Sequence, residues 1–130
     1  MIGFAGLSHL GIVSSIVVAS KGFEVMAYDP RRDLCSDLAA NRLPILEPGL
    51  PELLEANQGR IRFAAEAVSL AECDLLYFSL DVQTGADNGS DLSELRTLID
   101  DLMLQIKPGA TLVVLSQVPP GFTRQLSVHF

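Results

Sequence analysis

A glycine-rich hexapeptide, GLSHLG, is the first segment with a recognisable chemical pattern; it begins at Gly6 and ends at Gly11. These two glycines have the spacing of the first and third glycines of GxGxxG, and Ser8 stands at the second. In that pattern the first glycine permits a tight turn, the third permits close packing of a helix on a strand, and the backbone at the second approaches a pyrophosphate. We therefore expect a phosphate-binding turn composed of Gly6, Ser8, His9, Leu10 and Gly11.

Ser8 adds a Cβ and a hydroxyl where the pattern has neither, and this leaves three interpretations open. The hydroxyl can hydrogen-bond a phosphate, or the side chain can keep a dinucleotide away. Alternatively, Gly6 and Gly11 only shape a turn between a strand and a helix. The pattern alone is weak evidence, but here it follows an apolar run and precedes a segment with helical spacing.

Asp29 is the next candidate, because it ends an apolar run and follows Gly11 by 18 residues. An acidic side chain about 20 residues beyond such a turn accepts a hydrogen bond from a ribose 2′-hydroxyl, which favours NAD over NADP. Asp29 followed by Pro30 also fits a helix N-cap with proline at the first helical position, and the two roles are compatible. Arg31 and Arg32 come next; an arginine here is able to meet a 2′-phosphate, although a solvated surface is the commoner environment.

The elements that must position these residues alternate between strands and helices. Short apolar runs predict strands at residues 2–5, 23–28, 61–63, 75–79 and 111–115. Helical spacing predicts helices at residues 10–20, 33–41, 50–57, 66–72 and 92–106, and residues 84–91 are predicted to form a loop.

Apolar strands that alternate with helices indicate a parallel sheet covered on both faces. We therefore expect an α/β fold of the Rossmann type, a doubly wound parallel sheet with strand order 3-2-1-4-5 and helices on both faces. Ligands bind such sheets at the carboxyl ends of the strands, where the strand order reverses. The loops expected there are residues 6–11, 29–32, 80–91 and 116–123.

The composition indicates one folded domain over residues 1–130, with 48% hydrophobic and 19% charged residues. A net charge of -7 argues against nucleic acid as a partner, and no apolar run is long enough for a membrane span. Cys35 and Cys73 predict two buried free thiols and a cytoplasmic location. We expect no metal site, and we interpret His9 and His129 as residues without a partner.

Six segments, of which the first includes the glycine-rich hexapeptide, resemble the UDP-glucose/GDP-mannose dehydrogenases over nearly the whole chain. They are GLSHLGIV at 6–13, LPILEPGLPELL at 43–54, GRIRF at 59–63, DLSEL at 91–95, KPGATLVVLS at 107–116 and VPPGFTRQL at 118–126. Such enzymes oxidise a sugar-nucleotide alcohol to a carboxylate in two NAD-dependent steps, in polysaccharide biosynthesis among other roles. The resemblance implies NAD as the cofactor, with further contacts at Thr84 and Gln117.

In that family the catalytic cysteine, lysine and asparagine lie on later segments, and neither Cys35 nor Cys73 matches the nucleophile. The resemblance therefore implies a cofactor domain without catalytic residues, inactive alone and lacking a C-terminal sugar-nucleotide domain. Because the sequence ends inside a predicted helix at Phe130, we expect the domain to be truncated there. Oligomer formation stays open.

Three departures from the family pattern support a second hypothesis. Ser8 replaces a glycine, Asp81-Val82-Gln83-Thr84 stands where the family has a GTPT-like run, and Gln117 replaces the threonine of STxPxG. The alternative is a degenerate Rossmann module that no longer binds a dinucleotide and acts in interaction or regulation. The EPGL segment that begins at Glu47 is interpreted as a helix-entry turn or, alternatively, as an edge of the cofactor site.

Overall fold

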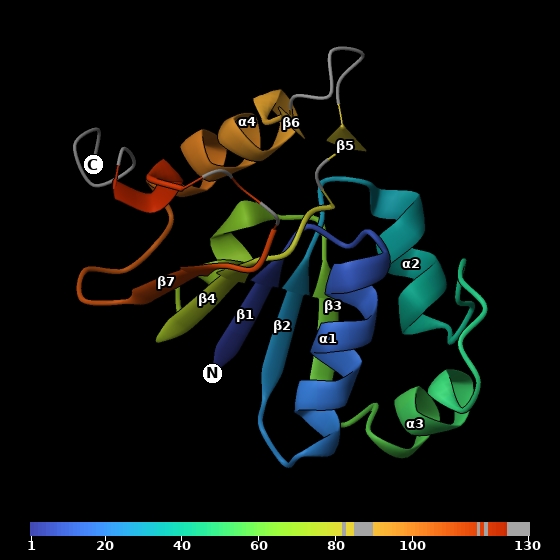
Figure 1. The fold of residues 1–130 in the computed structure, drawn as a ribbon. Helices are drawn as coiled ribbons and strands as arrows, with labels where there is room; N and C mark the ends of the chain where they lie inside the picture. Colours follow the sequence, from blue (N-terminus) through green and yellow to red (C-terminus); the bar gives the residue numbers. More distant parts are fainter. Residues whose placement is uncertain (82, 85–89, 117, 119, 125–130) are drawn as a thin grey trace.

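A computed structural model describes residues 1–81, 83–84, 90–116, 118 and 120–124 of the chain. Within this part, five parallel strands form one sheet in the order β3-β2-β1-β4-β7 (Figure 1). The strands are β1 (Ile2–Ala5), β2 (Val25–Tyr28), β3 (Ile61–Ala64), β4 (Leu75–Phe78) and β7 (Thr111–Val114). Since β7 is the fifth strand of this sheet in chain order, the predicted order 3-2-1-4-5 is confirmed.

Alternating side chains of the strands build a hydrophobic core on each face of the sheet. Phe4 of β1 packs with buried residues of α1 (His9–Ser20), α2 (Arg32–Ala39) and α3 (Leu50–Ala56). The next residue, Ala5, belongs to the second core, which includes α4 (Ser93–Leu102) and the short helix η1 (Ala67–Leu70). Figure 1 shows the two helical layers on opposite sides of the sheet, which confirms the doubly wound arrangement.

The helix predicted at residues 66–72 is wrong, because the structure has only the four-residue 3₁₀ helix η1 there. Leu70 and Cys73 are both buried, and their spacing of three matches the three residues per turn of a 3₁₀ helix. The amide of Cys73 donates to the carbonyl of Leu70, so the chain turns directly into β4. This short connection therefore buries Leu70 and Cys73 without a full α-helix.

Most other predicted elements differ from the structure by one or two residues at a boundary, and the start of the second strand and the end of the last long helix show why. The second strand begins at Val25 instead of residue 23, because β2 pairs with the four-residue β1 from Val25 onward and Phe23 stays exposed. The last long helix, α4, ends at Leu102 instead of residue 106, and the amide of Gln105 donates to the carbonyl of Leu102 in a tighter turn.

The segment predicted to be a loop at residues 84–91 contains a small antiparallel ladder. Strand β5 (Gln83–Thr84) pairs with β6 (Ser90–Asp91), so the two ends of the segment are held side by side. In the described part of the chain, no helix is long and apolar enough to cross a membrane. The same residues include no cluster of three or more His, Cys, Asp or Glu arranged for a metal ion.

Candidate functional site

The glycine turn lies at the carboxyl end of β1 and has a backbone that only glycine fits. Gly6 has a φ of +100°, and a Cβ built there would lie 2.9 Å from the backbone nitrogen of Leu80. A Cβ at Gly11 would lie 1.9 Å from the carbonyl oxygen of Gly6. Gly6 therefore permits the turn, and Gly11 permits α1 to pack against it, as the sequence predicts.

Ser8 occupies the N-cap position of α1, but its hydroxyl does not cap the helix. Instead, the Ser8 Oγ accepts a hydrogen bond of 2.7 Å from the backbone amide of Asp81, which follows β4. The first backbone bond of the helix runs from Ile12 to the Ser8 carbonyl, and its first turn carries no acidic residue. The N-terminal amides of α1 and the positive end of its dipole therefore form an environment that favours an anion.

Asp29 lies beside this turn, because β1 and β2 are neighbours with parallel carboxyl ends. Its side chain is almost completely buried, and its Oδ2 accepts a 2.9 Å hydrogen bond from the amide of Leu7. The predicted meeting of the glycine turn and Asp29 at the switch point is confirmed. The N-cap interpretation of Asp29 is wrong: α2 begins at Arg32 with Arg31 as its N-cap, and the Arg31 amide donates to Asp29 Oδ1 across a tight turn.

The Arg31 side chain closes around the same carboxylate. Its Nε donates to Asp29 Oδ1 at 2.8 Å and its Nη2 to Oδ2 at 3.0 Å, while Nη2 also reaches the Leu7 carbonyl at 3.3 Å. Burial alone raises the pKa of the Asp29 carboxyl, but the hydrogen bonds from the Arg31 side chain and from the amides of Leu7 and Arg31 outweigh it, so the pKa is lowered. Asp29 is therefore a buried, charged acceptor.

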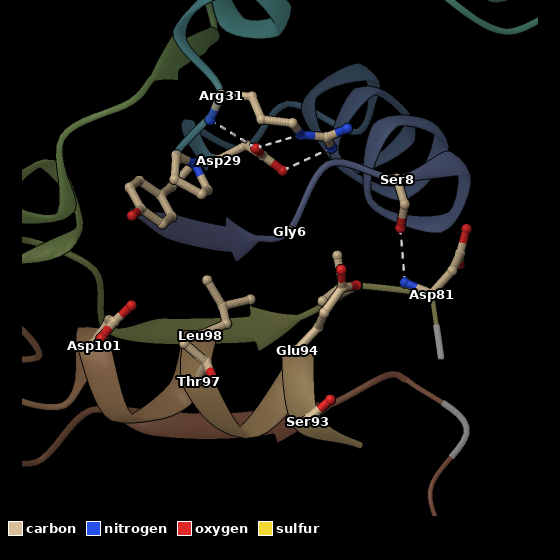
Figure 2. Close-up of a pocket in the computed structure, with 13 residues that line it drawn as sticks. Gly6, Ser8, Asp29, Arg31, Asp81, Ser93, Glu94, Thr97, Leu98 and Asp101 are labelled. Carbon is tan, nitrogen blue, oxygen red and sulfur yellow. Dashed lines mark hydrogen bonds and ion pairs between the residues drawn. The ribbon is translucent and has the colours of Figure 1, made fainter. Parts of the chain in front are cut away.

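A cavity of about 650 Å³ opens between the glycine turn and α4 (Figure 2). One wall consists of Gly6 and Ser8 of the turn together with Asp29 and Arg31 at the end of β2. The facing wall is a row of α4 residues: Ser93, Glu94, Thr97, Leu98 and Asp101. Sequence reasoning missed this second wall, although its members recur at helical spacing and so share one face of the helix.

Two buried serines hold the strand ends that carry the loops around the cavity. Ser79 follows β4, and its Oγ donates to the carbonyl of Gly6 at 2.9 Å. Ser116 follows β7, and its Oγ donates to the carbonyl of Leu80. The sequence signal for both is a serine at the carboxyl end of an apolar run predicted to be a strand.

His9 has a partner, contrary to the expectation from sequence. Its Nε2 lies 2.9 Å from Oε1 of Glu47, so the start of α1 is connected to the loop before α3. These residues are 38 positions apart in the chain, and for that reason the sequence pattern did not reveal the pair. Gly49 is the N-cap of α3 with a φ of 81°, which confirms that the EPGL segment is a helix-entry turn.

The remaining predicted residues are placed as follows. Leu10 belongs to the first turn of α1, and Thr84 belongs to β5. Gln117 and His129 lie outside the described residues. Cys35 and Cys73 are buried free thiols, and burial raises the pKa of both, so neither is a ready nucleophile.

The sheet order, the glycine turn and the carboxylate after β2 define a dinucleotide-binding domain of the Rossmann type. Within this class, the chain belongs to the UDP-glucose/GDP-mannose dehydrogenase family: the model of the family's NAD binding domain matches residues 1–129.

Individual relatives agree with this assignment. UDP-glucose 6-dehydrogenase of Pseudomonas aeruginosa is 28% identical over 119 residues, which are 89% of this chain and 26% of that protein. A UDP-glucose dehydrogenase structure from Pyrobaculum islandicum is 29% identical with a TM-score of 0.82 and covers 92% of this chain and 29% of its own. The ternary complex of GDP-mannose dehydrogenase from Pseudomonas aeruginosa has the same fold, with a TM-score of 0.90 at 23% identity, and covers 98% of this chain and 31% of its own. The chain thus spans less than a third of these relatives.

Proposed function

We propose that this chain binds NAD in the cavity between the glycine turn and α4, and that it is the cofactor domain of a sugar-nucleotide dehydrogenase. The observation that carries the proposal is the hydrogen bond from Leu7 to Asp29, which places a buried carboxylate beside a glycine turn at the switch point. Family membership supports NAD as the cofactor. When bound, NAD supplies the hydride acceptor for oxidation of an alcohol.

The residues of the site divide among three parts of a dinucleotide: the central pyrophosphate, a ribose and the reacting end. The turn from Gly6 through Ser8, His9 and Leu10 to Gly11 is proposed to hold the pyrophosphate with its backbone amides. Asp29 is proposed to accept from a ribose 2′-hydroxyl, with Arg31 beside it. Thr84 and Gln117 stay candidates for contacts toward the reacting end of the cofactor.

The charge of the cavity favours a ribose without a 2′-phosphate. Among the described residues of its lining, four are carboxylates and one is a guanidinium: Asp29, Asp81, Glu94, Asp101 and Arg31. Because Arg31 is already paired with Asp29, a further phosphate would meet mainly negative charge. This supports NAD over NADP.

The activity of the whole dehydrogenase requires residues that we do not find in this chain. We infer that residues 1–130 form the cofactor domain alone, and that the catalytic residues and the sugar-nucleotide site come from a further domain. We propose that the whole enzyme acts in the cytoplasm, in polysaccharide synthesis. The buried thiols of Cys35 and Cys73 support this division, since neither lines the described cavity.

Calorimetric titration of the purified chain with NAD, and in parallel with NADP, tests the proposal. We expect saturable binding of one NAD and weaker binding of NADP. Thermal unfolding is the second readout, because a ligand at 100 times its Kd stabilises a fold by about 2.7 kcal/mol. If the folded chain shows neither heat nor a thermal shift at millimolar NAD, the alternative of a Rossmann module without a dinucleotide takes its place.

A further inference from the structure

The Arg31 guanidinium occupies the acceptor positions at which a ribose would bind. A carboxylate offers about four lone-pair sites for hydrogen bonds. At Asp29, Oδ1 accepts from the amide and Nε of Arg31, and Oδ2 accepts from the amide of Leu7 and from Nη2 of Arg31. All four sites are therefore used within the protein, and two of the four donors belong to the Arg31 side chain (Figure 2).

Arg31 is the partner that is able to move. Its side chain is 59% exposed, whereas that of Asp29 is 3% exposed. The two backbone amides keep the carboxylate oriented whether or not the guanidinium is present. Since Arg31 also bonds to the carbonyl of Leu7, its side chain fastens the end of β2 to the glycine turn. Displacing it into solvent exposes an acceptor that is already in position.

A role of Arg31 as a ligand for a 2′-phosphate fits the surroundings less well. A phosphate that reached the guanidinium would also approach the Asp29 carboxylate, which is bonded to that guanidinium through both oxygens. Asp81, Glu94 and Asp101 add further negative charge to the cavity. A neutral ribose meets no such repulsion.

We propose that Arg31 is an intramolecular competitor of the ribose: its side chain holds Asp29 closed, and NAD must displace it to bind. This inference rests on the proposed NAD function and adds a residue that sets the affinity. Arg31 acts through Asp29, so it is a positioning residue with a negative effect on cofactor binding. The sign of that effect distinguishes it from a residue that contacts the cofactor.

The test compares NAD affinities of Arg31→Ala, Arg31→Lys and Arg32→Ala by calorimetry. Arg32→Ala is the matched control, because it removes the same charge from the adjacent position. The Arg32 side chain pairs with Glu66 and not with Asp29. Arg31→Ala is expected to tighten NAD binding by about three- to tenfold, the range for replacing one or two hydrogen bonds. Arg31→Lys keeps the charge but loses the two-pronged geometry, so a smaller gain is expected. Weaker binding in Arg31→Ala, with Arg32→Ala unchanged, would overturn the inference.

An NMR measurement on the wild-type chain needs no variant. The Arg31 Nε proton is bonded to Asp29, so it is expected to exchange slowly with water before NAD is added. Saturation with NAD should shift this signal and speed its exchange. An unchanged Arg31 signal at saturating NAD would overturn the inference and leave the NAD function intact. If neither wild type nor Arg31→Ala binds NAD while both are folded, the proposed function itself fails.

Discussion

Asp29 combines near-complete burial with a full negative charge, and its neighbours explain how. Removing a carboxylate from water is unfavourable unless hydrogen-bond donors replace the lost hydration. Here two backbone amides and one guanidinium do so, and they lower the pKa of the carboxyl despite its burial. The same charge is what a ribose hydroxyl would use as an acceptor, so one residue serves stability and the proposed binding role.

Asp29→Asn is expected to lower the free energy of unfolding at neutral pH by about 1–3 kcal/mol, because the amide cannot accept from all the donors around it. Since the pKa of Asp29 is lowered in the folded state, its charged form stabilises the fold above the unfolded-state value of about 3.9, and this contribution is lost as the pH falls through the folded value. The stability difference between wild type and variant should therefore shrink below about pH 4. Urea unfolding at a series of pH values measures it, and a difference that stays constant down to pH 2 would contradict this account.

The residue types and spacings predicted the acceptor but not its partner. Gly6, Gly11 and Asp29 could be assigned because backbone geometry fixes their spacing in a strand-turn-helix unit. The bonds of Arg31 to Asp29 and of His9 to Glu47 depend on the positions of side chains in three dimensions, and in the second case on loops far apart in the chain. Periodicity contains no information about such contacts.

At the scale of elements, one hydrogen bond connects the start of α1 to the segment after β4. The Ser8 hydroxyl accepts from the Asp81 amide across the opening of the cavity, at the end remote from Asp101 (Figure 2). A serine at this position more often accepts from the amides of its own helix. The bond therefore ties together the two loops that flank the switch point, and it occupies a backbone donor at the site.

Ser8→Gly is expected to tighten NAD binding by about 1 kcal/mol, which is fivefold, because it removes a side chain from ligand space and releases the Asp81 amide. Stability should fall by no more than about 1 kcal/mol, since the bond to the Asp81 amide is lost but glycine is an acceptable N-cap. Ser20→Gly, at the other end of α1, is the control and should leave the affinity unchanged. Titration calorimetry measures the NAD affinities. Weaker binding by Ser8→Gly would contradict this prediction and would indicate that the Ser8 hydroxyl is a phosphate ligand.

The strands were predicted closely and the connections less so. The three central strands, β2, β1 and β4, are largely buried apolar runs, so their sequence signal is strong. The edge strands β3 and β7 are more exposed. The crossover between β3 and β4 was misjudged because a seven-residue segment with helical spacing suits either a short α-helix or a 3₁₀ turn, and only packing against the sheet selects between them. The α4 wall of the cavity was missed because its polar residues look like an ordinary solvated face.

At the scale of the whole molecule, the chain is a cofactor domain. The glycine turn and the end of β2 form one wall of its cavity, and α4 of the same chain forms the facing wall. The relatives reported above are more than three times as long, and in our proposal the additional residues supply the sugar-nucleotide site and the catalytic groups. The acidic character of the chain does not oppose this function, because the donors for an anion are backbone amides at the start of α1 rather than basic side chains.

The most direct test of this account is backbone NMR during titration of the chain with NAD, because it locates the ligand as well as detecting it. We predict saturable shifts concentrated on the amides of residues 6–11, on Asp29 and Arg31, and on Asp81. The amide signals of the exposed residues around Phe23, at the opposite end of β2, should not shift. Saturable shifts confined to any other surface, or no shifts at millimolar NAD in the folded chain, would contradict the claim that the switch-point cavity is an NAD site.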